Sequence, residues 1–290
     1  MNRKIQIENL TLKVKNKTIL NNINMSINGR DSIAILGPNG AGKTTLMNVL
    51  LNLQKYKSGS VKNDFLNLPS HKIGVHIQES SLNGLMKVKE VLNLFLFEGN
   101  NNDIISQYDL ADKLNQRIST LSGGEKQKLF IVLTFQNDPE IVFIDEITTG
   151  LDVESRSNII SFIKRKMNLG NKTLIMVTHY LEEAEALCDK FAFINEGRLI
   201  EFGSKHDLYQ KYKLSKKMYL ELLSSIDLTS NLEMKQLKEN MYEISLQSDQ
   251  DMIEAMNYIS RNNDKIKNYS IKEPTLEHLY KKIIVDGESL

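Results

Sequence analysis

The sequence is poor in the residues that build secreted and membrane-spanning proteins. Its 290 residues include one cysteine and no tryptophan. A single cysteine excludes an intrachain disulfide framework and any all-cysteine metal site, which indicates a reducing, cytosolic compartment. The most apolar stretch, residues 91–97, is interrupted by Asn93 and is far shorter than the ~20 residues of a membrane span. We therefore expect a chain that does not cross a membrane by itself.

An excess of one charge is also missing, because 37 basic residues face 36 acidic ones. This balance removes the usual reason to expect nonspecific binding to nucleic acid or to an anionic lipid surface. The N-terminal segment carries charges but lacks the apolar core of a signal peptide. The length corresponds to about two domains.

Hydrophobic patterning predicts an α/β domain followed by a smaller module. Short runs of alternating apolar and polar residues over residues 1–30 predict antiparallel strands. Beyond them, apolar strands alternate with helical patterns, which is typical of a parallel sheet covered on both faces. The predicted strands are 32–36, 141–144 and 173–178, and the predicted helices are 44–53, 155–167 and 180–188. After residue 212 we expect a small α+β module with strands at 218–223 and 241–246 and helices at 251–261 and 274–284. The expected domains are residues 1–212 and 213–290.

A glycine-rich turn follows the strand at 32–36 and opens the next helix. It fits the phosphate-binding pattern G-x-x-x-x-G-K-[ST] in the strand–turn–helix setting that this pattern requires. Backbone N–H groups of such a turn and the N-terminus of its helix attract phosphate oxygens. Lys43 is expected to reach the β and γ phosphates, and the Thr44 hydroxyl to ligate Mg²⁺. The predicted nucleotide-binding residues are Gly37, Pro38, Asn39, Gly40, Ala41, Gly42, Lys43, Thr44 and Thr45.

Two carboxylates, Asp145 and Glu146, follow the apolar strand at 141–144. Ligands of open α/β sheets gather at the carboxyl ends of the strands. We expect Asp145 to hold Mg²⁺ through water, and Glu146 to polarise the attacking water as general base. His179 ends another apolar strand, where a lone histidine is more often a surface or core residue than a functional one.

A second helix start with anion-binding chemistry lies at residues 121–128, where Ser122, Gly123 and Gly124 precede Glu-Lys-Gln. This Leu-Ser-Gly-Gly sequence, 23 residues before Asp145, resembles the signature motif of the ATP-binding-cassette (ABC) family. The family's other motifs occur in order: the phosphate loop, Gln78, the carboxylate pair, Gly150-Leu-Asp152 and His179. The resemblance covers roughly residues 1–210. It implies a P-loop NTPase fold of the ABC nucleotide-binding type, with an N-terminal antiparallel β part, a helical subdomain and a small C-terminal module.

The resemblance implies roles that the residues alone leave open. Ser122 and Gly124, with Gly123 between them, would contact the γ-phosphate held by the phosphate loop of an opposite subunit. Asp152 would lie at the dimer seam, and His179 would contact the γ-phosphate. Gln78 would approach Mg²⁺ and the lytic water and sense the membrane partner. ATP and Mg²⁺ are the implied cofactors.

The implied function is the ATP-hydrolysing motor subunit of a transporter. The expected partners are separate transmembrane permease subunits and a second ATP-binding subunit, either itself or a paralogue, without nucleic acid. The expected location is the cytoplasmic face of a bacterial cell membrane. Residues 273–280 resemble the C-terminal appendage of drug, antibiotic and bacteriocin exporter ATPases, which favours export of a drug, an antibiotic or an amphipathic peptide. An importer ATPase and a soluble cassette protein acting on nucleic acid or ribosomes remain the alternatives.

Three positions depart from the family pattern. Val14 stands where an aromatic residue normally stacks on adenine, Ile147 where a proline normally follows Glu146, and Lys128 where arginine is common. Base stacking on an aromatic side chain is worth about 1–3 kcal/mol, so weaker nucleotide affinity or base selectivity is expected. Isoleucine in place of proline is expected to loosen the turn after Glu146.

Two further expectations concern packing. Apolar residues of segments 79–90 and 91–97 predict a groove for a short helix of the membrane subunit. Cys188 is expected to be a buried, inert thiol, because free cysteines are among the most buried residues.

Overall fold

The computed structural model describes residues 3–76, 82–96, 105–106, 108, 110–168, 172–223, 233–285 and 287. It divides into two compact units, Met1–Ser204 and Lys205–Leu290. The sequence pattern changes after residue 212, whereas the structure groups the short helix α7 (Lys205–Lys211) with the second unit.

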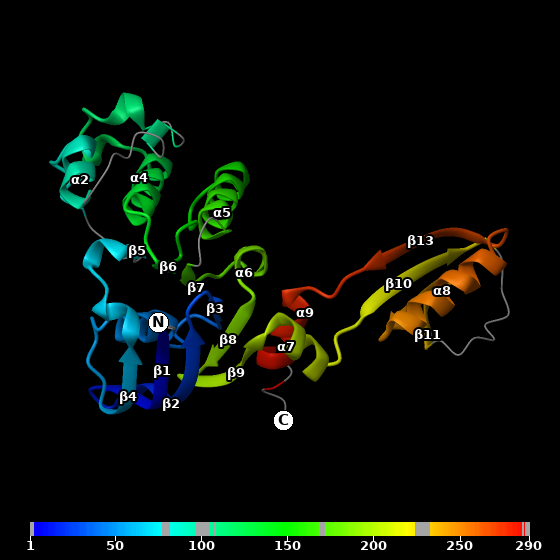
Figure 1. Cartoon of the computed structure of the whole chain (residues 1–290). Helices are drawn as coiled ribbons and strands as arrows, with labels where there is room; N and C mark the ends of the chain where they lie inside the picture. The colour runs from blue at the N-terminus through cyan, green and yellow to red at the C-terminus, as the bar shows by residue number, and fades with distance from the viewer. Residues whose placement is uncertain are drawn as a thin grey trace. The chain divides into compact units, whose positions relative to one another are not determined.

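A six-stranded sheet forms the centre of the first unit, in the order β5-β6-β7-β3-β8-β9 (Figure 1). Neighbouring strands from β5 to β8 run parallel, and β9 pairs antiparallel with β8. Every residue of β6 and β7 is buried, because a parallel sheet covered on both faces needs consecutive apolar residues. The predicted α/β class is confirmed. The strands are β3 (Ser32–Leu36), β5 (Ile73–His76), β6 (Ile141–Asp145), β7 (Thr173–Val177), β8 (Lys190–Asn195) and β9 (Arg198–Ser204).

An antiparallel sheet of three strands, in the order β2-β1-β4, forms the predicted N-terminal β part. It consists of β1 (Lys4–Val14), β2 (Lys17–Asn28) and β4 (Ser58–Asn63). Alternate residues of β1 and β2 are buried in one core with the helix α1 (Lys43–Leu50) and with one face of the six-stranded sheet. This core holds α1, and therefore the turn before it, against the ends of the parallel strands.

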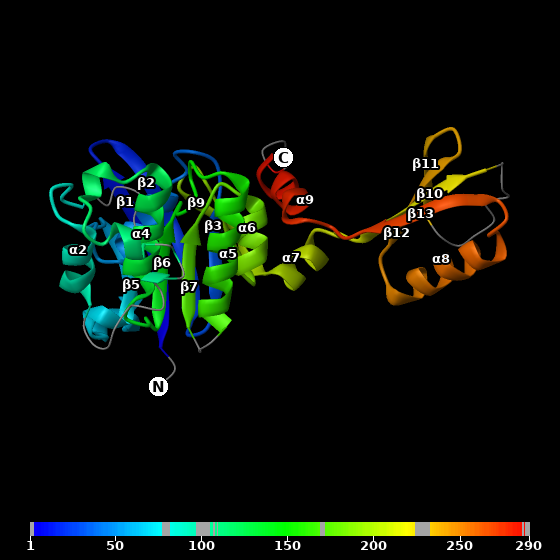
Figure 2. The same ribbon diagram turned by 90° about the horizontal axis from the view of Figure 1, so that it is seen from above.

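Helices flank the six-stranded sheet of the first unit (Figure 2). The helices α2 (Val88–Phe95) and α4 (Gly123–Phe135) contact each other and form the helical part beside β5, while α5 (Val153–Asn168) contacts α6 (Leu181–Leu187), which packs on β3. Cys188 follows the last residue of α6 and is buried, which raises the pKa of its thiol, as expected of an inert cysteine.

Within the described ranges, no helix is both long and apolar enough to cross a membrane. Short 3-10 turns occur at Asp64–Asn67, Ser70–Lys72, Ala111–Lys113 and Ile118–Thr120.

The second unit contains a four-stranded antiparallel sheet, in the order β11-β12-β10-β13, and the helix α8 (Asp249–Arg261). Alternate residues of two strands meet Ala255 and Ile259 of α8 in a separate core. β11 and β13 were not predicted, because Ile266 is the only buried residue in either strand and no buried face marks them. The remaining elements are β10 (Lys216–Leu222), β11 (Met234–Lys238), β12 (Met241–Leu246), β13 (Ile266–Lys272), α9 (Leu276–Tyr280) and a π-helical turn at Lys281–Val285.

Candidate nucleotide-binding site

The phosphate loop, residues 37–45, connects β3 to α1 and is wound tightly against neighbouring backbone. A Cβ added to Gly37 would lie 1.9 Å from the Ile194 carbonyl oxygen. Gly42 precedes α1 with a φ of 102°, and a Cβ there would lie 2.9 Å from the Ile19 carbonyl oxygen. The fold itself therefore requires both glycines. No side chain of the described residues caps the start of α1, so its first backbone N–H groups can face phosphate oxygens.

Lys43, the first residue of α1, is only 6% exposed. Its ammonium group donates hydrogen bonds of 2.9 Å to the carbonyl oxygens of Gly37 and Pro38. Burial lowers the pKa of Lys43, and the carboxylates of Glu146 and Asp145 oppose this shift. The cation thus spans the loop, where it can exchange two carbonyl partners for phosphate oxygens.

Asp145 ends β6 and is completely buried. Neither of its carboxylate oxygens has a hydrogen-bond partner among the described residues. Burial raises the pKa of Asp145, and the Thr44 hydroxyl acts in the opposite direction. A fully buried carboxylate with no well-formed hydrogen bond to the described residues is unfavourable, and a divalent cation would supply compensating positive charge. Since Mg²⁺ binds one or two protein oxygens together with substrate phosphates, Thr44 and Asp145 fit this ion.

Glu146 and His179 meet at the ends of β6 and β7. The Nε2 atom of His179 contacts the Oε1 atom of Glu146. The backbone N–H of Glu146 donates to the Val177 carbonyl at 3.0 Å, which fixes the turn after β6 against the end of β7. The Glu146 side chain is 9% exposed and that of His179 is 38% exposed, so the pair is reachable from the histidine side. Two residues predicted from separate strands thus form one pair.

The signature segment starts α4 with a capping box. The Ser122 hydroxyl accepts a hydrogen bond from the Glu125 N–H at 3.2 Å, and the Glu125 carboxylate accepts one from the Ser122 N–H at 2.8 Å. Further along α4, the Gln127 amide donates to the Ile147 carbonyl. Ile147 itself is 2% exposed. The turn after Glu146 was expected to be loosened by isoleucine in place of proline. Burial of Ile147 and the hydrogen bond from Gln127 hold this turn instead.

Asp152 lies at the start of α5 and accepts two hydrogen bonds from Ser155. Its Oδ1 accepts from the backbone N–H at 2.9 Å and its Oδ2 from the hydroxyl at 2.7 Å. These bonds lower the pKa of Asp152. The carboxylate therefore stabilises the first turn of α5 and stays ionised.

The predicted site residues fall into two groups. The phosphate loop and the carboxylate pair gather with His179 at the ends of β3, β6 and β7. Ser122, Gly123, Gly124 and Asp152 instead lie at the starts of α4 and α5, where their hydrogen bonds are local. Gln78 lies outside the described residues. The structure thus brings the phosphate loop, the carboxylate pair and His179 together, while the hydrogen bonds of the signature segment stay within its own helix start.

Sequence reasoning missed one buried polar group beside the site. Glu183 is 2% exposed, and its carboxylate accepts hydrogen bonds from the hydroxyls of Thr148 and Thr178. These threonines lie two residues after Glu146 and one before His179. The position of these threonines next to predicted site residues was the only available signal in the sequence. Their shared partner Glu183 could not be predicted, because α6 meets them only in the folded chain.

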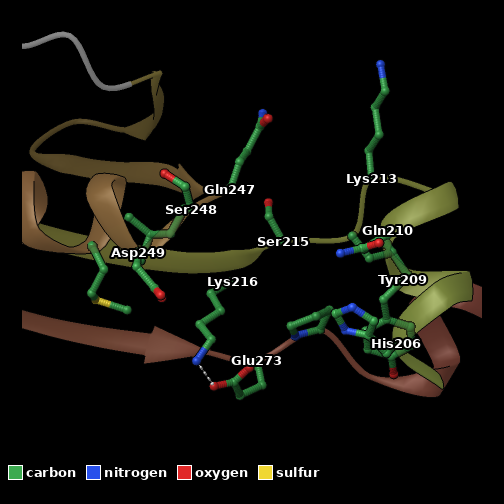
Figure 3. Close-up of a pocket in the computed structure, with 14 residues that line it drawn as sticks. His206, Tyr209, Gln210, Lys213, Ser215, Lys216, Gln247, Ser248, Asp249 and Glu273 are labelled. Atoms are coloured by element: carbon green, nitrogen blue, oxygen red, sulfur yellow. Dashed lines mark ion pairs between the residues drawn. The ribbon is translucent and has the colours of Figure 1, made fainter.

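The second unit has a pocket of about 570 Å³, lined by residues of α7 and of the segment that starts α8 (Figure 3). Lys216 and Glu273 form an ion pair of 2.7 Å at its wall. None of the predicted nucleotide-site residues lines this pocket. It is therefore separate from the predicted ATP chemistry.

A phosphate loop between a parallel strand and a helix, with a carboxylate pair at the end of a neighbouring strand, defines a P-loop nucleotide-binding ATPase. The model of the ABC transporter family matches residues 20–149. The linearmycin resistance ATP-binding protein LnrL of Bacillus subtilis (strain 168) is 31% identical in an alignment 219 residues long, which covers 70% of this chain and 70% of that protein. The Nod factor export ATP-binding protein I of Burkholderia lata is 31% identical in an alignment 221 residues long, which covers 71% of this chain and 72% of that protein. The chain belongs to the ABC transporter family, as an ATP-binding and ATP-hydrolysing subunit.

Solved structures share the fold. The structure of an ATP-binding subunit of an ABC transporter has a TM-score of 0.65 at 22% identity and covers 72% of this chain and 93% of that one. A dimeric post-hydrolysis structure of the ATP-binding cassette MJ0796, bound to ADP and phosphate, has a TM-score of 0.61 at 23% identity and covers 69% and 98%. At these identities the likeness concerns the fold.

Proposed function

We propose that this chain is the motor subunit of a bacterial exporter, working at the cytoplasmic face of the membrane. Two such chains, or this chain and a paralogue, bind ATP between them in a head-to-tail dimer. Support for export comes from relatives whose names refer to linearmycin resistance and Nod factor export, each 31% identical over about 70% of the chain. The proposed cargo is a drug, an antibiotic or an amphipathic peptide.

Within one chain, Lys43 and the first N–H groups of α1 bind the phosphates. Thr44 and Asp145 would hold Mg²⁺, which would supply positive charge to the transferred phosphoryl group. Glu146 accepts the proton of the attacking water, and His179, which contacts Glu146, orients that carboxylate and faces the γ-phosphate. By resemblance to the family, Gln78, which lies outside the described residues, would approach Mg²⁺ and the lytic water.

The observation that carries the dimer is the open space around the signature glycines. A Cβ added to Gly123 or Gly124 would meet no heavy atom of the described residues within 4 Å, as at Gly40 of the phosphate loop and unlike Gly37 and Gly42. The fold of this chain alone therefore gives no packing reason for glycine at either position. Close approach of an external anion to the start of α4 supplies one. A two-fold dimer would place the γ-phosphate bound by one chain there, on Ser122 of the other, and would bring Asp152 to the seam.

The dimer is tested with the Glu146→Gln variant, which keeps the shape of the side chain and removes the base. In saturating Mg-ATP, light scattering of the full chain with its membrane subunits and any paralogue should show a stable dimer of ATP-binding subunits. The matched control is Glu146→Gln combined with Gly124→Leu, which fills the open space and should abolish the dimer while the phosphate loop still binds ATP. A strictly monomeric ATP-binding subunit under these conditions would contradict the proposal.

A groove of about 510 Å³ supports docking of a transmembrane subunit. It lies beside β5, between α2 and α4, and its apolar lining suits the apolar face of a short amphipathic helix. Leu94 and Phe95 line it and are 67% and 50% exposed, whereas Val88 and Val91 of the same helix are buried in the core. The exposed side chains of α2 are therefore the proposed docking residues, and the buried ones only pack.

Charge substitutions test this surface in reconstituted vesicles. Leu94→Glu should abolish transport and substrate-stimulated hydrolysis together, while the isolated chain still hydrolyses ATP. Leu85→Glu, at a side chain that is 71% exposed just before α2, should act in the same direction. Leu53→Glu changes a side chain that is 63% exposed elsewhere on the unit and serves as the control. Normal transport by a folded Leu94→Glu complex would exclude this groove as the docking surface.

A further inference from the structure

Among the described residues, Glu183 is the most deeply buried carboxylate that has no proposed catalytic role, and only 2% of its surface is exposed. It lies in the first turn of α6, four residues after His179. An ionised carboxylate is unfavourable inside a protein unless donors and a positive charge surround it. The contacts of this side chain meet that requirement.

Each oxygen of Glu183 binds a hydroxyl from a different turn. Thr148 donates to Oε1, and Thr178 donates to Oε2 at 2.7 Å. The Nε atom of Arg156 lies 3.6 Å from Oε1, and its guanidinium group lies 3.7 Å from the centre of the Tyr180 ring. The positive charge is therefore itself held in place by stacking on the segment that leads into α6.

The two hydroxyls belong to the turns that carry the proposed hydrolytic pair. Thr148 follows Glu146 after β6, and Thr178 precedes His179 after β7. β6 and β7 are parallel neighbours with Asp145 opposite Val177, so both turns leave the same edge of the sheet. One carboxylate thus ties together the two segments whose relative placement decides whether Glu146 and His179 meet.

We propose that Glu183 is a positioning residue for ATP hydrolysis, which holds the turns bearing Glu146 and His179 in fixed register. The inference rests on the proposed roles of these two residues. Glu183 itself acts only through the threonine hydroxyls. Because a misplacement of about 1 Å can cost about 100-fold in rate, small shifts of these turns should affect turnover far more than ATP binding.

The test is Glu183→Gln in the full chain, since glutamine keeps the size of the side chain but cannot accept both hydroxyl hydrogen bonds in the same way. We expect kcat to fall about 10- to 100-fold while the Kd for ATP stays within about two-fold. Glu182→Gln, an exposed neighbour on the same helix, removes the same charge and should leave both values unchanged. A wild-type kcat in Glu183→Gln would overturn the proposal.

A double-mutant cycle separates positioning from general damage. If Glu183 acts through Glu146, then Glu183→Gln should lower the residual single-turnover rate of Glu146→Gln by less than about three-fold. A full multiplicative loss in that background, or a parallel loss of ATP affinity, would assign Glu183 a merely structural role. If Glu146→Gln alone kept wild-type turnover, the assignment of Glu146 as general base would be wrong, whatever the effect of Glu183→Gln. This result distinguishes failure of the proposed function from failure of the positioning role.

Thermal unfolding shows whether Glu183→Gln folds. If it does not, the pair Thr148→Val and Thr148→Ser decides the question, because valine removes the hydroxyl at similar size and serine restores it. We expect valine to lower kcat at unchanged ATP affinity and serine to recover most of it. Equal turnover of both variants and the wild type would overturn the proposal.

Discussion

Replacing Lys43 by alanine removes the cation that spans the phosphate loop. In this structure its ammonium group donates two hydrogen bonds of 2.9 Å, to the carbonyl oxygens of Gly37 and Pro38. Hydrogen bonds that involve a charged group contribute about 1.5–3 kcal/mol each. In the proposed site, ATP binding exchanges these two bonds for two to phosphate oxygens, in which both partners are charged and the bonds are stronger.

Only the difference between the two sets of bonds contributes to affinity. We take it as about the strength of one charged hydrogen bond, 1.5–3 kcal/mol, which corresponds to a Kd for ATP about 10- to 150-fold higher in Lys43→Ala. Burial lowers the pKa of Lys43, so its charge is held there at a cost in desolvation. Removing it should therefore leave the fold intact, as thermal unfolding can verify.

Isothermal titration of the full chain with ATP, ADP and AMP provides the assay. If Lys43 reaches the β and γ phosphates as proposed, the loss should be largest for ATP and nearly absent for AMP. Lys164→Ala, at an exposed position of α5, is the matched control and should bind all three as the wild type does. A Kd for ATP within about two-fold of wild type, or an equal loss for AMP, would refute the reasoning.

Three further variants test the site and its surroundings. Glu146→Gln should retain ATP binding but lose about 10²–10⁴ in turnover, and retention of more than about a third of wild-type turnover would exclude it as the base. Val14 is 48% exposed at the end of β1. ATP and GTP should therefore bind within a few-fold, and Val14→Tyr should tighten ATP binding by adding a stack; a strong preference of the unmodified protein for ATP would count against this. Burial lowers the pKa of His76 from 6.5 to about 4, so the unfolded chain binds the proton more tightly and the free energy of unfolding should fall as the pH drops below about 6.5. In urea titrations, lowering the pH from about 7.5 to 5.5 should cost about 1.4 kcal/mol more in the wild type than in His76→Phe, and equal pH dependence would contradict this.

The sequence by itself determined the chemistry of the first unit and the type of its sheet. The phosphate loop around Lys43 and the carboxylate pair are encoded in consecutive residues, so their spacing is visible without any fold. The buried strands β6 and β7 are runs of apolar residues, because burial on both faces leaves no polar alternation. The same local logic predicted β10, β12 and α8 of the second unit, whereas β11 and β13 are almost entirely exposed and were not predicted.

Only the tertiary structure decided which predicted groups meet. Glu146 contacts His179 because parallel pairing of β6 and β7 brings the ends of both strands to one edge. Gln127 reaches the Ile147 carbonyl 20 residues away, and Glu183 joins Thr148 across 35 residues. Such contacts depend on the register of strands and the packing of helices, which no local pattern of residues specifies. The open space around Gly123 and Gly124 is likewise visible only in the folded structure, because the atoms that a Cβ would meet come from residues distant in the sequence.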